Sequence, residues 1–135
     1  MKYIKVFEKF DEDYIKSSID DIFVELKDEG MLVKTYHFIP STGIVKKEYF
    51  DVVIKGKQEY VEDHVFTIPF ETSHIKSYVD TLIDFMSEFC PDFDYHIEEY
   101  DNTFFCFKYE NTLSDGKEMS DSKVGTIVII FTKKN

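Results

Sequence analysis

The residues best suited to chemistry in this sequence are Asp94, His96 and Glu98. Alternate residues of a β-strand point to the same face, so a strand here would present all three side chains together. Carboxylates and imidazole are ligands for divalent metals, which makes these residues the candidates for a metal site or a small catalytic centre at His96. The sequence favours the alternative, a solvated strand face, because no other feature indicates metal or thiol chemistry.

The connection that follows this segment decides which residues share its face. A two-residue turn would place Phe105 and Phe107 there, whereas a three-residue loop beginning at Asp101 would place Cys106 there. The second register divides polar from apolar residues more cleanly. It would bring the thiol of Cys106 near His96, an arrangement that can activate a nucleophile.

Other catalytic patterns are missing from the sequence. It contains no phosphate-binding glycine loop, no GxSxG, no HExxH and no EF-hand loop. Ser73 and His74 are adjacent, and adjacent residues of a helix do not face each other. Cys90 and Cys106 form neither a CxxC pair nor a zinc-binding spacing. We therefore expect no cofactor and lean against an enzyme.

Charge narrows the classes of partner. The chain of 135 residues has a formal net charge of −11, and lysine supplies all 16 basic residues. Direct binding to nucleic-acid phosphates or to an anionic membrane needs basic patches, so both are disfavoured. An acidic exterior can serve solubility, or it can meet a basic protein.

Carboxylates gather in two segments, 8–29 and 88–101. Two solvated faces are the simpler interpretation. In the other interpretation the segments flank one concave region, which would occupy the nucleic-acid-binding groove of another protein by placing charges where phosphates would lie. The candidate binding residues are Asp20, Asp21, Glu25, Asp28, Asp94 and Glu98.

Two segments, 14–29 and 73–89, repeat apolar residues at helical spacing. Gly30 is expected to end the first helix, and Thr72 or Ser73 to cap the second. The polar stretch 111–122 is predicted to be a mobile loop. Strands are predicted over 31–39, 44–55, 62–68, 93–100, 104–110 and 125–132.

This order predicts one α+β domain over 1–135, with two amphipathic helices packed on one mostly antiparallel sheet of about 5–6 strands. Turn residues at 40–43 join the first two strands as a hairpin. The nearly continuous apolar run 126–131 suits a strand covered on both faces, in the centre of the sheet. Pro69 places the segment 62–68 at an edge.

An internal repeat is a further hypothesis. Residues 15–17 and 75–77 are both Ile-Lys-Ser, at an offset of 60, and the Tyr-His pairs at 36–37 and 95–96 match at 59. A duplicated helix–strand–strand unit would relate the halves by a pseudo-two-fold axis and make His37 equivalent to His96. The alternative is chance similarity between two amphipathic helices.

Two features of the sequence indicate the kind of genome that encodes it. They are the opening residues Lys2 to Phe10 and the lack of alanine. Alanine codons are GC-rich, so their absence indicates an AT-rich genome. The segment resembles the start of small uncharacterised proteins from AT-rich bacteriophages. The resemblance implies an accessory or virion-associated role and brings no catalytic residue.

Together these features predict a non-catalytic, phage-type protein that binds another protein, such as a host or defence protein, through its acidic surface. One alternative is a virion or assembly subunit, for which a homo-oligomer is an option. The other is a small enzyme or metal-binding protein centred on His96. The expected location is the host cytoplasm or the virion.

Overall fold

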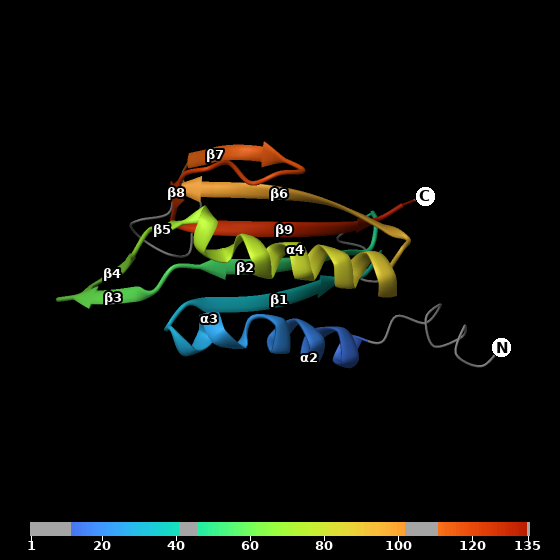
Figure 1. Ribbon diagram of the computed structural model, residues 1–135, viewed down its shortest axis with the longest axis horizontal. Helices are drawn as coiled ribbons and strands as arrows, with labels where there is room; N and C mark the ends of the chain where they lie inside the picture. Colours follow the sequence, from blue (N-terminus) through green and yellow to red (C-terminus); the bar gives the residue numbers. More distant parts are fainter. Residues whose placement is uncertain (1–11, 41–45, 102–110, 135) are drawn as a thin grey trace.

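A five-stranded antiparallel sheet organises the structure, a computed structural model that describes residues 12–40, 46–101 and 111–134 (Figure 1). The strands run in the order β1-β2-β9-β6-β7 across the sheet. Their bounds are Leu32–Phe38 (β1), Tyr49–Lys55 (β2), Phe93–Asp101 (β6), Asn111–Gly116 (β7) and Thr126–Lys133 (β9). Helices cover one face of this sheet, which confirms the α+β class.

The helical layer consists of α2 (Glu12–Ile22), α3 (Val24–Asp28) and α4 (Thr72–Phe89). The first predicted helix is interrupted at Phe23, which takes φ −100° and ψ 12° and buries its ring completely. Gly30 follows α3 with φ +97°, a left-handed conformation that costs glycine little. Glu71 occupies the N-cap position of α4 without a side-chain cap, so the predicted cap at Thr72 or Ser73 is wrong.

Burial follows from the strand register. Phe50, Val52 and Ile54 of β2 pair with residues 131, 129 and 127 of β9, and this set turns toward the helices. Full burial of such a side chain contributes about 1.5–3 kcal/mol. The predicted central position of the run 126–131 is confirmed, because β9 lies between β2 and β6. The helical face of the core also holds Ile15, Ile19, Leu26, Ile75, Val79, Leu82 and Met86.

Two small sheets accompany the main one. β3 (Gln58–Val61) and β4 (His64–Thr67) form a hairpin that projects beyond the sheet in Figure 1. β5 (Phe70–Glu71) pairs with β8 (Lys123–Val124) beside the start of α4. At the base of the hairpin, a Cβ on Gly56 would lie 2.0 Å from the carbonyl oxygen of Ile68. Only glycine permits so close an approach of two backbones.

The observed strands correct part of the sequence prediction. The hairpin of the first two strands is confirmed by the antiparallel pairing of β1 with β2. The mobile loop predicted over 111–122 is wrong for its first half, because residues 111–116 form β7 and pair with β6. The pairing with β6 holds residues 111–116 in a strand although the segment is polar. The segment 62–68 contributes β4 to the two-stranded hairpin, where it is an edge strand as predicted, but outside the main sheet. The predicted strand 104–110 and residues 41–43 of the first turn lie outside the described residues.

Strand order also bears on the internal repeat. A pseudo-two-fold axis would exchange β1 with β6, but β1 is an edge strand whereas β6 lies between β9 and β7. His37 pairs with Phe50 and shares its helix-covered face, while His96 pairs with Ile130 on the opposite face. The two histidines are therefore not equivalent. Duplication of the helix–strand–strand unit stays a prediction.

Candidate functional site

The three residues first singled out lie on the face of β6 away from the helices. Asp94, His96 and Glu98 pair with residues 132, 130 and 128 of β9, so their side chains share that face as predicted. The imidazole Nε2 of His96 lies 3.1 Å from Oε2 of Glu98, and the hydroxyl of Tyr100 donates to Oε1 of the same carboxylate. Asp94 instead forms an ion pair with Lys117, which holds the pKa of its carboxyl below the ordinary value.

Asp51 of β2 joins this face, and sequence reasoning missed it. It pairs with Ile130, which also pairs with His96, so the three residues form one row across the sheet. Burial raises the pKa of Asp51 to about 6, helped by the negative charge of Glu98 and opposed by His96. Its Oδ1 is buried without a hydrogen-bond partner in the described structure. In the sequence, the signal for Asp51 was a single carboxylate between two apolar residues of a predicted strand, Phe50 and Val52.

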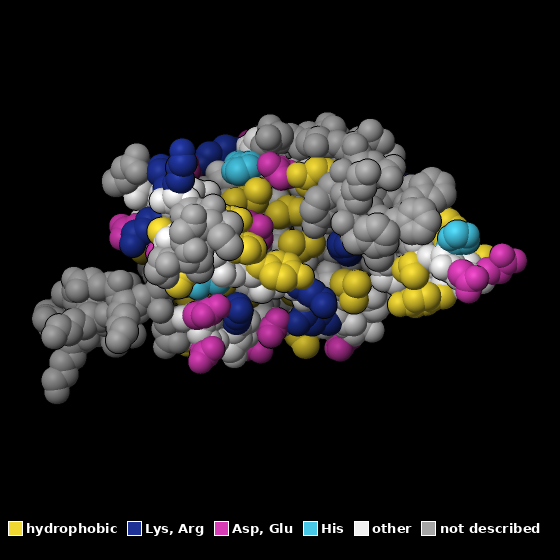
Figure 2. Space-filling model, turned by 180° about the vertical axis from the view of Figure 1, so that it is seen from behind, with side chains coloured by type: hydrophobic (Ala, Val, Ile, Leu, Met, Phe, Trp, Pro, Cys, Tyr) yellow, Lys and Arg dark blue, Asp and Glu magenta, His cyan; other side chains and the backbone are white. Residues whose placement is uncertain are grey.

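The geometry limits the chemistry of this row. Asp51 and His96 lie two strands apart, which separates their backbones by about 10 Å. Oδ1 of Asp51 accepts no hydrogen bond from any described residue. Within residues 12–40, 46–101 and 111–134, no three His, Cys, Asp or Glu side chains are placed to hold a metal ion. Cys106 lies outside the described residues. Figure 2 shows hydrophobic side chains across the middle of this face, with charged ones mostly toward its rim.

The helical layer carries the other candidates. Asp20, Asp21, Glu25 and Asp28 are all exposed on α2 and α3, and Asp20 Oδ1 lies 2.6 Å from the ammonium of Lys27. Asp94 and Glu98 lie on the opposite side of the sheet, so the six predicted binding residues do not form one surface. The reason is strand alternation, which turns even-numbered residues of β6 away from the helices.

Two side-chain contacts tie α3 to α4. The hydroxyl of Tyr78 donates to Oε2 of Glu25 at 3.1 Å, and Nε2 of His74 lies 2.6 Å from Oε1 of Glu29. Both pairs join residues more than forty positions apart in the chain. The carboxylates of Glu25 in α3 and of Glu29 just after it are thereby held against α4.

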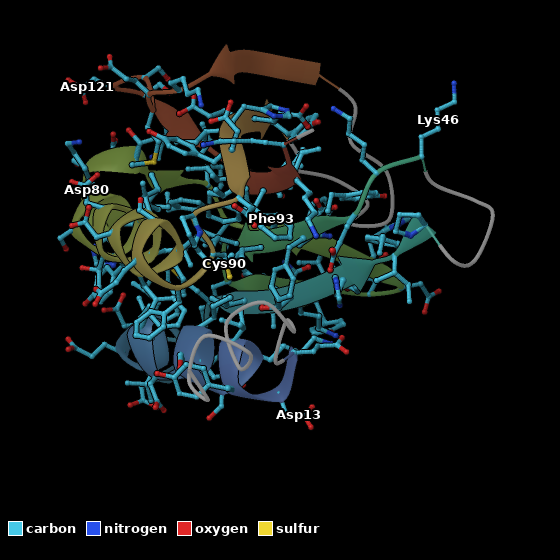
Figure 3. The ribbon with its side chains drawn as sticks, turned by 90° about the vertical axis from the view of Figure 1, so that its right-hand side faces the viewer. Asp13, Lys46, Asp80, Cys90, Phe93 and Asp121 are labelled. Atoms are coloured by element: carbon cyan, nitrogen blue, oxygen red, sulfur yellow. The ribbon has the colours of Figure 1, made fainter. Side chains whose placement is uncertain are left out.

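The outer face of α4 adds carboxylates that were not among the predicted binding residues. Asp80, Asp84 and Glu88 are exposed and recur every four residues. In Figure 3 the side chain of Asp80 points outward from α4, while Cys90 lies between α4 and the sheet. The sequence could have indicated these three carboxylates, because they recur at regular spacing on the polar side of the predicted helix 73–89.

His37 belongs to a separate, partly buried ion-pair group. Its Nε2 lies 2.6 Å from Oε2 of Glu48, and its Nδ1 lies 3.6 Å from Oε1 of Glu12 at the start of α2. Lys16 lowers the pKa of Glu12, with a smaller effect from His37. The group links the first turn of α2 to the hairpin of β1 and β2, which is a structural role.

Comparison with protein-family models, curated proteins and solved structures found no match to this chain.

Among the described helices, none combines the length and the apolar character needed to cross a bilayer.

Proposed function

We propose that the protein is a non-catalytic binding protein that contacts a basic partner through its helical layer. The contact surface, called here the acidic helix surface, comprises Asp20, Asp21, Glu25, Asp28, Asp80, Asp84 and Glu88. The observation that carries the proposal is the pair of side-chain contacts from Glu25 to Tyr78 and from Glu29 to His74. They fasten the acidic segment 25–29 to α4, which carries the other carboxylates of this surface.

The spacing of the charges favours one class of partner. Asp80, Asp84 and Glu88 follow one another about 6 Å apart along the axis of α4. A row of regularly spaced negative charges is what the phosphates of a nucleic acid offer to a binding groove. The partner in this proposal is a nucleic-acid-binding protein of the host or of its defence against a phage, and binding inhibits it. The site of action is then the host cytoplasm.

Charge-neutralising variants test the proposal. The protein would be used to capture its partner from the source host, and binding would be measured with and without double-stranded DNA as competitor. Asp80→Asn, Asp84→Asn and Glu88→Gln in one variant should weaken binding at least tenfold. A control with the same charge change, Glu59→Gln, Glu62→Gln and Asp63→Asn on the β3–β4 hairpin, should weaken it less than twofold. Equal losses in the two variants would contradict a defined surface.

The second candidate is a small enzyme or ligand-binding protein centred on His96. It is favoured by one observation, the buried Oδ1 of Asp51 in the same row of the sheet, which has no hydrogen-bond partner among the described residues. A ligand that binds only the folded state raises the melting temperature. Thermal unfolding with divalent metals and small amines, for the wild type and for His96→Ala, tests it. Unchanged melting with every compound would remove this candidate.

A further inference from the structure

A hollow of about 280 Å³ lies between α2 and the edge strand β1. Its walls are Lys16 and Asp20 of α2 and residues 33–36 of β1. Consecutive residues of a strand point to opposite faces of the sheet. A hollow that touches four consecutive residues therefore follows the lateral edge of the strand, where backbone groups are exposed, and not one of its faces. This hollow is called here the β1 edge groove.

On its outer side, the backbone along this groove has no partner among the residues that the structure describes. β1 is the first strand in the sheet order and pairs only with β2. On the outer side of an edge strand, every second residue directs its N–H and C=O away from the sheet. Within the described parts of the chain, no group hydrogen-bonds to the backbone of Val33–Tyr36 on that side. The edge is therefore a template for one more strand.

We propose that the β1 edge groove receives an extended segment of the basic partner, which adds to the sheet as a sixth main-sheet strand next to β1. This deepens the proposed function and rests on it, because the acidic helix surface and the groove would bind the same partner. Backbone hydrogen bonds would supply affinity, and alternate side chains would supply specificity, as in other cases of strand addition.

The charges beside the groove decide between possible occupants. α2 carries four carboxylates, Glu12, Asp13, Asp20 and Asp21, against the single ammonium of Lys16. That ammonium is held 3.0 Å from Glu12. A second copy of this chain would bring another net charge of −11 and another acidic helix to the same edge. Repulsion between like charges opposes that pairing and favours a basic segment.

The two sides of the added strand would meet different surroundings. Residues that face α2 would lie near the carboxylate of Asp20, which also contacts the ammonium of Lys27, and a lysine or arginine there would share that carboxylate. Residues that face the other way would lie beside Tyr36, which is 46% exposed, and beside the aliphatic stem of Lys34. Apolar side chains suit that position. The groove therefore fits a segment in which basic and apolar residues alternate.

Hydrogen exchange of the complete chain tests this inference. The probe is a ten-residue peptide that alternates lysine and valine, and the controls are the same peptide N-methylated at every second residue and the same peptide with glutamate for lysine. The parent peptide should slow exchange at alternate amides of residues 33–36 at least tenfold. N-methylation should weaken binding about tenfold, because it removes backbone hydrogen bonds. The absence of this protection at millimolar peptide would overturn the inference.

The remaining outcomes separate the groove from the acidic helix surface. Binding that falls with salt but survives N-methylation supports the acidic helix surface and overturns strand addition. Binding that is lost on N-methylation but is equal for the lysine and glutamate peptides supports strand addition and overturns the basic partner. Asp20→Asn should weaken the lysine peptide several times more than Asp84→Asn. A protein that dimerises alone, with these amides protected, would make a second copy the occupant.

Discussion

The hydroxyl of Tyr78 on α4 donates a hydrogen bond to the carboxylate of Glu25 on α3, across the contact between the two helices. The accepting carboxylate raises the pKa of the Tyr78 phenol. Because both groups are reached by solvent, we expect a small but measurable coupling between them. A double-mutant cycle of Tyr78→Phe and Glu25→Ala, followed by urea unfolding, measures it. Additive effects of the two substitutions would contradict the contact.

Phe23 should be the most costly residue to truncate in the helical layer. Phe23 lies between α2 and α3 and is 0% exposed. The centroid of its ring lies 6.3 Å from the ring centroid of Tyr78. Phe23→Ala should lower the free energy of unfolding by about 3–5 kcal/mol, through lost burial and the remaining cavity. The adjacent Val24 is 49% exposed, so Val24→Ala should cost under about 0.5 kcal/mol. Similar losses for the two would show that the break is not anchored by Phe23.

Asp51 should make stability depend on pH. Its pKa rises from 3.8 to about 6 on folding, so the folded state binds the proton more tightly. The contribution to stability is complete below about pH 4 and is lost as pH rises through 6. Asp51→Asn has no charge to bury, and we expect it to raise the free energy of unfolding at pH 7.5 by about 1 kcal/mol after allowance for solvent screening.

Denaturant unfolding of Asp51→Asn and wild type between pH 4 and pH 7.5 checks this expectation. The difference in unfolding free energy should be near zero at pH 4 and should grow with pH. Asp94→Asn is the matched control on the same face of the sheet, and its dependence should have the opposite sign, because the pKa of Asp94 is lowered by Lys117. A flat difference for Asp51→Asn would show that its carboxyl is solvated.

Cys90 should react slowly with thiol reagents. Burial raises the pKa of its thiol to about 11, with further effects from the charges of Glu48 and Asp92. The thiolate is the reactive form, so labelling at pH 8 should be about 100-fold slower than for a small free thiol. The measurement needs Cys106→Ser, which leaves one cysteine, and timed labelling followed by mass spectrometry. Labelling as fast as that of the free thiol would contradict the buried position.

Much of the fold could be predicted from local patterns. Apolar spacing placed both amphipathic segments, and the run 126–131 indicated the central strand, because a strand covered on both faces needs apolar residues throughout. Two features could not be predicted. The irregular backbone at Phe23, whose ring contacts that of Tyr78 in α4, is not reported by a helical periodicity. The strand at residues 111–116 is polar and owes its conformation to pairing with β6.

The candidate site was predictable only within single elements. Strand alternation correctly placed Asp94, His96 and Glu98 on one face, because that rule concerns neighbours in one strand. Grouping Asp94 and Glu98 with the carboxylates of α2 required the arrangement of elements in space, which sets the two groups on opposite sides of the sheet. Asp51 was missed for the same reason, since only the pairing of β2 and β6 with β9 brings it into the row of His96.

The position of β9 has a consequence for synthesis on the ribosome. β9 follows every other described strand in the chain, yet it lies between β2 and β6. Until residues 126–133 leave the exit tunnel, those two strands each keep a side with no neighbour, and such sides recruit other chains. A nascent or truncated product that stops before Thr126 would therefore be prone to aggregate, and completion of the sheet must wait until translation has passed this strand.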